Sequence, residues 1–316
     1  MKKNTTRRLA FAAAALLAVS ACGGSDNGDG GSDLTGTILI DGSSTVAPLL
    51  TLYAEDFQAA NAGVRVTVGT SGTGGGFEKF CAGETDISTA SRSIKDSEKE
   101  ACAAAGIEFY EVQVANDALS VVVNPDNDWA ACLTMEQLAT MWSPESEGKI
   151  TNWNQIDPSF PDQKLTLFGA GTDSGTFDYF TKEVNGEEGA SRTDYSPSED
   201  DNVTITGVSG DAGAVGYFGY SYLEENLDRI KAVAIDSGNG CVEPSIESVQ
   251  AGEYTPLARP LFIYVKKEAA ARAEMKAFLE FIYENQDATI EEALYVPLSE
   301  EQKTAAKAKI DEIVAS

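Results

Sequence analysis

Histidine is absent from the 316 residues of this chain, and that absence removes most of the common catalytic machinery. Without an imidazole, neither a Ser–His–Asp nor a Cys–His catalytic group can be assembled, and metal sites lose their commonest ligand. The sequence also lacks a G-x-S-x-G nucleophile elbow and a phosphate-binding loop ending in Gly-Lys-Ser/Thr. A pair of carboxylates could still catalyse a reaction, but no such pair stands out. These absences favour a binding protein without cofactor or metal over an enzyme.

Basic residues are scarce as well. The chain has 23 Lys and Arg residues against 50 Asp and Glu, which gives a net charge of −27. Nucleic-acid binding requires a basic surface that neutralises phosphates, so this balance argues against a nucleic-acid partner. A small anion can still bind where local dipoles point toward it, because net charge does not describe a single pocket.

Long apolar stretches are confined to the first residues. A basic start, Met1–Arg8, precedes the apolar run Leu9–Ala21, and this pattern predicts a signal peptide over residues 1–21. The run is too short for a lasting membrane span. The stretch "VSAC" resembles the lipobox of bacterial lipoproteins, which makes Cys22 the lipidated first mature residue; the alternative is a plain signal peptide with an incidental cysteine. The Gly/Ser/Asp-rich segment that follows predicts a flexible tether over residues 22–33. We therefore expect an extracytoplasmic protein, anchored to the membrane on its periplasmic side or at the cell surface.

Cysteine is rare, and no C-x-x-C spacing suggests zinc. Apart from Cys22, the chain has Cys81, Cys102, Cys132 and Cys241. An even number of cysteines in an oxidising compartment predicts two disulfides, for which three connectivities are possible. We favour Cys81–Cys102 and Cys132–Cys241, because the first pair brackets one compact unit; the alternative is free buried thiols.

Beyond the tether, short apolar strands alternate with segments of helical spacing. This alternation predicts an α/β fold with mostly parallel sheets, in which ligands bind beyond the carboxyl ends of strands. No Gly/Ser/Pro-rich linker separates two halves, so we expect two lobes joined by crossing strands. The best candidates for crossings are "VQVANDALSVVVNP" and "YTPLARPLFIYVKK". The predicted lobes are residues 34–116 with 258–316, and residues 117–257.

Three turns rich in glycine and hydroxyl groups each stand between a predicted strand and a predicted helix. They are Ser43–Thr45, Ser71–Gly74 and Asp173–Thr176, and a fourth segment, Ser88–Ile94, carries Arg92. The first backbone N–H groups of a helix lack intrahelical partners, and the helix dipole favours an anion there. Each turn alone could be an ordinary helix N-cap, and Arg92 an ordinary surface ion pair. Because three such turns occur together, we interpret them as one anion-binding site.

The motifs "DGSSTVAPL", "GTSGTGGGFEKFCAGETDISTASR", "GAGTDSGTFDYF" and "ARPLFIYV" together resemble the phosphate-binding proteins of ABC importers, the PstS family. The resemblance runs from about Gly36 to Pro297. It implies a type II periplasmic-binding-protein fold in which two lobes close over one inorganic phosphate and deliver it to ABC permease subunits. By match with the family motifs, the implied phosphate-binding residues are Ser44, Thr45, Ser71, Thr73, Arg92, Ser174, Gly175 and Thr176. The turn residues Gly72 and Asp173 complete the predicted set.

Two positions depart from the pattern of the best-known family members. Those members have an aspartate where this chain has Arg92, and an arginine where it has Ala170. The resemblance therefore implies that one guanidinium has moved to the other side of the site. Asp173 could replace the missing acceptor for a protonated phosphate, although it could equally serve as a helix N-cap. Selectivity for phosphate over sulfate stays open at this point.

The sequence leaves three alternative functions open. The first is binding of another tetrahedral oxyanion, such as sulfate, molybdate or tungstate. The second is an extracellular enzyme that acts on phosphoesters, which the missing histidines disfavour. The third is a surface adhesion or sensor protein that keeps the fold without transport. For all of them we expect a monomer.

Overall fold

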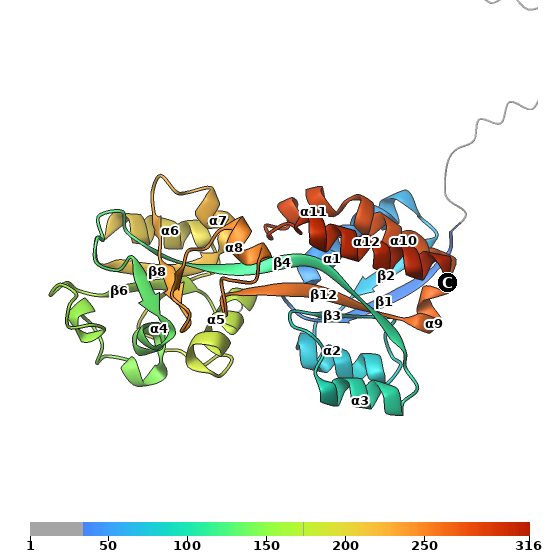
Figure 1. The fold of residues 1–316 in the computed structure, drawn as a ribbon, viewed down its shortest axis with the longest axis horizontal. Helices are drawn as coiled ribbons and strands as arrows, with labels where there is room; N and C mark the ends of the chain where they lie inside the picture. The colour runs from blue at the N-terminus through green and yellow to red at the C-terminus, as the bar shows by residue number, and fades with distance from the viewer. Residues whose placement is uncertain (1–33, 173) are drawn as a thin grey trace, which may run out of the picture. The chain divides into compact units, whose positions relative to one another are not determined.

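The computed structural model describes residues 34–172 and 174–316, and Figure 1 labels their elements. The predicted signal peptide, the lipidated Cys22, the tether and Asp173 lie outside the described residues. The strands are β1 (Gly36–Gly42), β2 (Val64–Val68), β3 (Ile87–Ala90), β4 (Phe109–Val123), β5 (Cys132–Thr134), β6 (Thr166–Ala170), β7 (Ser196–Ser198), β8 (Ala214–Gly219), β9 (Lys231–Ala232), β10 (Ala234–Asp236), β11 (Cys241–Val242) and β12 (Ala258–Lys266). The helices are α1 (Ala47–Ala60), α2 (Gly72–Cys81), α3 (Asp96–Ala104), α4 (Met135–Trp142), α5 (Gly175–Asn185), α6 (Asp201–Gly210), α7 (Tyr220–Glu224), α8 (Ile246–Gln250), α9 (Lys267–Ala270), α10 (Ala273–Glu284), α11 (Gln286–Glu292) and α12 (Glu300–Ala315), with 3-10 turns η1 (Pro144–Ser146) and η2 (Trp153–Gln155).

The main sheet joins two sets of parallel strands through an antiparallel centre. Its order is β2-β1-β3-β12-β4-β8-β6-β7. The strands β1, β2 and β3 are parallel to one another, and so are β6, β7 and β8, whereas β12 and β4 run antiparallel to their neighbours. The predicted α/β class is confirmed, and the parallel pairing holds within the two sets. Parallel pairing brings the carboxyl ends of β1, β2 and β3 to one edge, where the turns follow.

The strand β4 carries polar residues in its middle. Residues Phe109–Val123 form one continuous strand, which includes most of the crossing candidate "VQVANDALSVVVNP". Asn116 is buried and exchanges two backbone hydrogen bonds with Val296, at 3.0 and 2.9 Å, and Asp117 forms an ion pair with Arg259. These polar residues therefore make tertiary contacts without interrupting the strand.

The buried apolar residues form separate clusters. One cluster draws on residues 118–257 together with Val296, and another draws on residues 38–115 and 261–313. A third, smaller cluster lies under α2 and α3, and β12 contributes Phe262 and Tyr264 to it while Leu261 and Ile263 enter the second cluster. Successive side chains of β12 therefore point to opposite faces of the sheet, and both faces are buried. The predicted lobe boundaries stay a prediction, and this division of the core supports them.

Both predicted disulfides form. Cys81–Cys102 joins the ends of α2 and α3, and Cys132–Cys241 joins β5 to β11 at the edge of a small second sheet. Within the part of the chain that the structure describes, no helix is both long and apolar enough to span a bilayer.

Candidate anion-binding site

The first turn follows β1 and is held against β3. The N–H of Ser43 donates to the carbonyl of Thr89 at 3.0 Å, and the N–H of Ala47 donates back to the carbonyl of Ser43 at 3.1 Å as α1 begins. Gly42 has a φ of +146°, and a Cβ on it would lie 2.2 Å from the Thr89 carbonyl oxygen. Only glycine therefore fits at this position, and the close approach fixes where Ser44 and Thr45 stand.

The second turn lies beside the first. The N–H of Ser71 donates to the carbonyl of Gly42 at 3.1 Å, and α2 packs so closely that a Cβ on Gly76 would lie 2.5 Å from the Gly42 Cα. The Ser71 hydroxyl donates to Asp41, whose other oxygen accepts from Lys79 at 2.8 Å. Burial alone would raise the pKa of Asp41, but the hydrogen bonds from Lys79 and Ser71 outweigh it and lower that pKa. The Ser71 hydroxyl therefore bonds to an ionised carboxylate and its N–H to Gly42, whereas the first backbone amides of α2, from Gly72 on, lack intrahelical partners.

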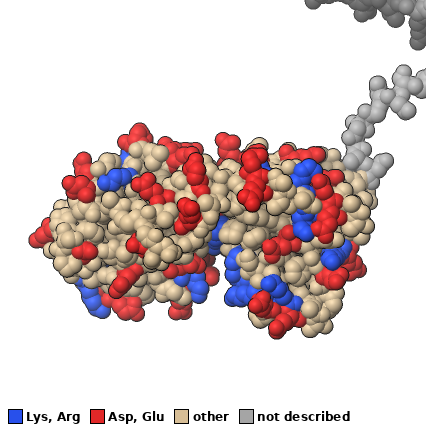
Figure 2. Space-filling model, viewed as in Figure 1, with Lys and Arg blue, Asp and Glu red and all other residues tan. Residues whose placement is uncertain are grey.

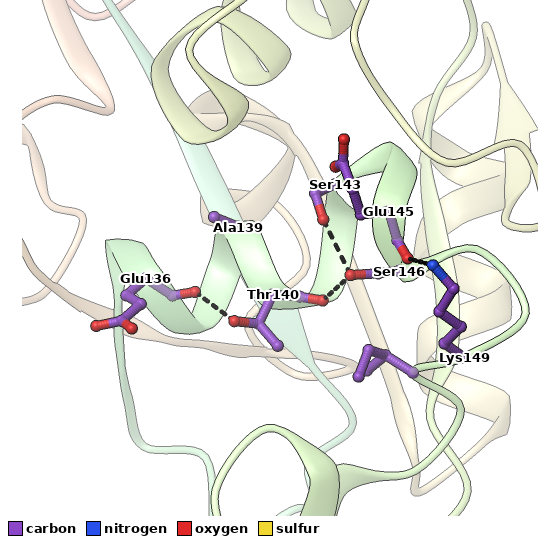
Figure 3. Close-up of a pocket in the computed structure, with 8 residues that line it drawn as sticks. Glu136, Ala139, Thr140, Ser143, Glu145, Ser146 and Lys149 are labelled. Carbon is purple, nitrogen blue, oxygen red and sulfur yellow. Dashed lines mark hydrogen bonds between the residues drawn. The ribbon is translucent and has the colours of Figure 1, made fainter.

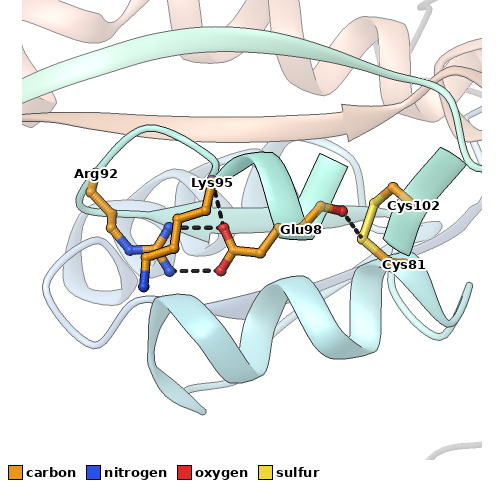
Figure 4. Close-up of a disulfide and its surroundings, with 5 residues drawn as sticks. All are labelled: Cys81, Arg92, Lys95, Glu98 and Cys102. Carbon is orange, nitrogen blue, oxygen red and sulfur yellow. Dashed lines mark hydrogen bonds and ion pairs between the residues drawn. A yellow bond between two sulfur atoms is a disulfide. The ribbon is translucent and has the colours of Figure 1, made fainter. Parts of the chain in front are cut away.

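The fourth segment contacts the second turn through Thr73. Its hydroxyl oxygen accepts from the N–H of Ser91 at 3.2 Å. The neighbouring Arg92 is engaged elsewhere, because its two terminal nitrogens donate to both oxygens of Glu98 at 2.8 and 2.7 Å (Figure 4). Burial would raise the pKa of Glu98, but the Arg92 hydrogen bonds lower it, so the pair is ionised. Among the described residues, no contact joins Arg92 to the first or third turn.

The third turn comes from the other predicted lobe and meets the first. The Ser174 hydroxyl accepts from the N–H of Thr176 at 3.1 Å and caps α5. A Cβ built on Gly175 would lie 3.6 Å from the Thr45 hydroxyl oxygen and 3.9 Å from that of Ser44. The starts of α1 and α5, which lie about 130 residues apart in the chain, are thus brought together with their hydroxyl groups.

Arg259, on β12, is the residue that sequence reasoning missed. Its Nη2 donates to the Thr45 hydroxyl oxygen at 2.7 Å, and the same nitrogen lies 3.0 Å from Oδ2 of Asp117. The guanidinium carbon lies 3.5 Å from the centre of the Tyr179 ring, a cation–π contact between β12 and α5. The sequence did carry a signal, because Arg259 and Asp117 stand on the two predicted crossing strands, and the register pairs them directly.

Two tyrosines hold the same region together. Tyr179 donates its hydroxyl to the carbonyl of Pro256, and Tyr295 donates to the carbonyl of Thr45. Burial raises the pKa of both phenols above the ordinary value, so both stay protonated and donate at neutral pH. The first contact holds α5 against the segment before β12, and the second holds the first turn against the segment after α11.

Two pockets differ in their relation to the turns. The pocket in Figure 3, of about 350 Å³, lies at α4 and η1, and its polar groups bond to one another, as when Ser146 donates to the carbonyl of Thr140 at 2.6 Å. It contains none of the predicted binding residues. A second pocket, of about 400 Å³, borders the start of the third turn at Gly171 and Thr172. Over residues 34–172 and 174–316, no cluster of acidic or cysteine side chains could hold a metal ion.

Among charged residues, acidic ones outnumber basic ones. In Figure 2, Asp and Glu side chains are spread over the visible face, while Lys and Arg gather in smaller groups. The partly buried guanidinium of Arg259 beside the first turn is therefore a local feature that the net charge of −27 does not reveal.

Comparisons with known proteins agree with this architecture. A family model described as "PBP superfamily domain" matches residues 27–286. The chain is 44% identical over 287 residues to protein SphX of Synechocystis sp., covering 90% of this chain and 83% of SphX. It is 37% identical over 302 residues to the phosphate-binding protein PstS of Staphylococcus saprophyticus, covering 95% of this chain and 92% of that protein.

A solved structure is similar as well. The crystal structure of a possible phosphate-binding protein from Planctomyces limnophilus is 43% identical, with a TM-score of 0.85, and the match covers 89% of this chain and all of that one. The homologues are binding proteins rather than enzymes, and so is this chain. The chain belongs to the PBP superfamily, with the two-lobed α/β fold of periplasmic binding proteins, and within it to the family of the phosphate-binding protein PstS.

Proposed function

We propose that the protein binds one inorganic phosphate at the meeting point of its helix starts and delivers it to an ABC importer. The observation that carries this proposal is the approach of Gly175, at the start of α5, to the Thr45 hydroxyl at the start of α1. Amides at helix starts and neighbouring hydroxyls are donors that an anion with several acceptor oxygens can satisfy together. The residues proposed to bind phosphate are Ser44, Thr45, Ser71, Gly72, Thr73, Arg92, Asp173, Ser174, Gly175 and Thr176.

The family relationship favours phosphate among the tetrahedral oxyanions. Relatives that align with almost the whole chain are named for binding phosphate. A site built of donors penalises an anion that leaves one of them unpaired, by about 1–3 kcal/mol for each buried group. Arg92 belongs to the proposed set as a sequence-based prediction, and its ion pair with Glu98 would have to open before it could reach the anion.

Titration calorimetry on the purified protein tests the proposal. We expect one phosphate site of micromolar affinity or better, with sulfate, molybdate and tungstate each binding more weakly at the same pH. Absence of both heat and a phosphate-induced rise in melting temperature would refute phosphate binding. Equal or tighter binding of sulfate would instead favour the alternative of another oxyanion.

The cellular context is proposed from the leader and the cysteines. We infer an extracytoplasmic protein held at the membrane by a lipid on Cys22, in keeping with two disulfides, which persist in oxidising compartments. Replacing Cys22 by alanine should move the protein from the membrane fraction to the soluble fraction. Unchanged partition would rule out the lipid anchor while leaving phosphate binding untouched.

A further inference from the structure

We propose that Arg259 is the cation that binds the anion directly, from the strand β12. This inference rests on the proposed function and deepens it. Arg259 donates to the hydroxyl oxygen of Thr45, the same atom that lies 3.6 Å from a Cβ built on Gly175. Its guanidinium therefore reaches the point where the starts of α1 and α5 meet.

The hydrogen bonds of Arg259 leave it able to bind a further oxyanion. Oδ2 of Asp117 accepts from Nε at 3.1 Å and lies 3.0 Å from Nη2 as an ion pair. A guanidinium carries five N–H donors, and among the described residues no acceptor contacts Nη1. Because the Thr45 oxygen accepts from Arg259, the Thr45 hydroxyl proton is directed elsewhere. Nη1 of Arg259 and the Thr45 hydroxyl can therefore both donate to one ligand.

The surroundings of Arg259 strengthen its attraction for an anion. The side chain is only 15% exposed, and one face of the guanidinium packs on the Tyr179 ring. A partly desolvated charge interacts more strongly than an exposed one. Asp117 and Tyr179 also fix the orientation of the fork before ligand arrives, so little side-chain freedom is lost on binding.

Arg92 offers a contrast within the same protein. Both of its terminal nitrogens already donate to Glu98, in the bidentate geometry that an oxyanion would need. Its side chain is 33% exposed, so its charge is also screened more by water. The two arginines therefore differ in whether their fork is available.

The test measures phosphate affinity by calorimetry for R259Q, R259K and R229Q. We expect R259Q to weaken binding by at least about tenfold, since a hydrogen bond to a charged group is lost. R259K should weaken it as well, because an ammonium cannot reproduce the fork. R229Q is the matched control, because the exposed Arg229 donates to Asn226 and Thr206, which are outside the proposed binding set, so affinity should stay within about threefold. Unchanged affinity in R259Q would overturn the inference.

A second measurement covers the case in which neither Arg259 variant folds. Phenylglyoxal labelling of the unmodified protein, mapped by peptide mass spectrometry, should be suppressed by phosphate at Arg259 and unaffected at Arg229. Equal labelling of Arg259 with and without phosphate would reject the inference. Failure of the unmodified protein to bind phosphate in the calorimeter would instead refute the proposed function, so the two failures are distinguishable.

Discussion

Substitution of Gly76 by alanine tests whether helix packing sets the geometry of the second turn. A Cβ on Gly76 would lie 2.5 Å from the Gly42 Cα and 3.2 Å from the Asp41 carbonyl oxygen. Carbon atoms pack at about 3.5–4.0 Å, so α2 must move away from β1 by about 1 Å. Overpacking of this kind costs about 1–3 kcal/mol of unfolding free energy. For a chain of this size that lowers the melting temperature by about 2–4 °C per kcal/mol.

The same displacement should weaken phosphate binding, because α2 begins at the second turn. A hydrogen bond of about 2.9 Å is lost when its donor shifts by about 1 Å. The loss of one or two such bonds to a charged ligand predicts a decrease in affinity of about tenfold or more. Calorimetry and thermal unfolding on the same preparation measure both effects.

Gly74, in the same helix, provides the control for stability. A Cβ at that position would meet nothing within 4 Å. Alanine there should raise the unfolding free energy by about 0.5–1 kcal/mol, because it removes backbone freedom from the unfolded chain. The reasoning is refuted if the Gly76 variant melts at the same temperature as the unmodified protein and binds phosphate equally well.

Two further substitutions test the electrostatic and covalent supports of the fold. Asp194→Ala should lower the unfolding free energy at pH 7 by about 3 kcal/mol, because it leaves Arg192, which is only 3% exposed, without its carboxylate. This figure is at the low end for a buried pair, because Asp194 itself is 37% exposed and partly screened by water. The Arg192 hydrogen bonds hold the pKa of Asp194 at about 2, below the ordinary value of 3.8, so this stabilisation is complete above about pH 4 and is lost as the pH falls through 2. Urea unfolding at several pH values measures it, with Asp311→Ala as an exposed control that should change stability by under about 1 kcal/mol at every pH. Cys102→Ser opens a disulfide that spans 21 residues, for which chain entropy predicts a loss of about 3 kcal/mol, and an unchanged urea midpoint would contradict that estimate.

The sequence predicted most of the fold because local signals and tertiary structure agree over most of the chain. In α1 the apolar residues recur at helical spacing in the sequence, and the structure buries Leu49, Leu50, Tyr53 and Phe57 on one side of it. The sequence of α6, "DNVTITGVSG", does not indicate a helix, because it is rich in β-branched residues and glycine, which favour other conformations. It forms because Asp200 caps it and Ile205 and Val208 are buried.

The sequence indicates which turns form the proposed site, but it indicates less clearly which charged side chains belong to it. A turn rich in glycine and hydroxyl groups before a helix can be recognised from a few residues of sequence, and the first and third turns do meet at Thr45 and Gly175. The partner of an arginine lies far away in the chain and cannot be read from its neighbours. Arg92 lies within reach of Glu98, whereas Arg259 contacts Thr45 over 214 residues. The register between β4 and β12, which only the structure gives, places Arg259 opposite Asp117 and so beside the first turn.

The placement of the two disulfides has a consequence for ligand capture. Cys81–Cys102 lies entirely within residues 34–116, and Cys132–Cys241 entirely within residues 117–257. Each covalent cross-link therefore braces one proposed lobe internally, and neither tethers one lobe to the other. Oxidation after export can therefore stabilise each half without adding a covalent link between them, so resistance to heat and proteases does not by itself restrict the proposed uptake and release of phosphate.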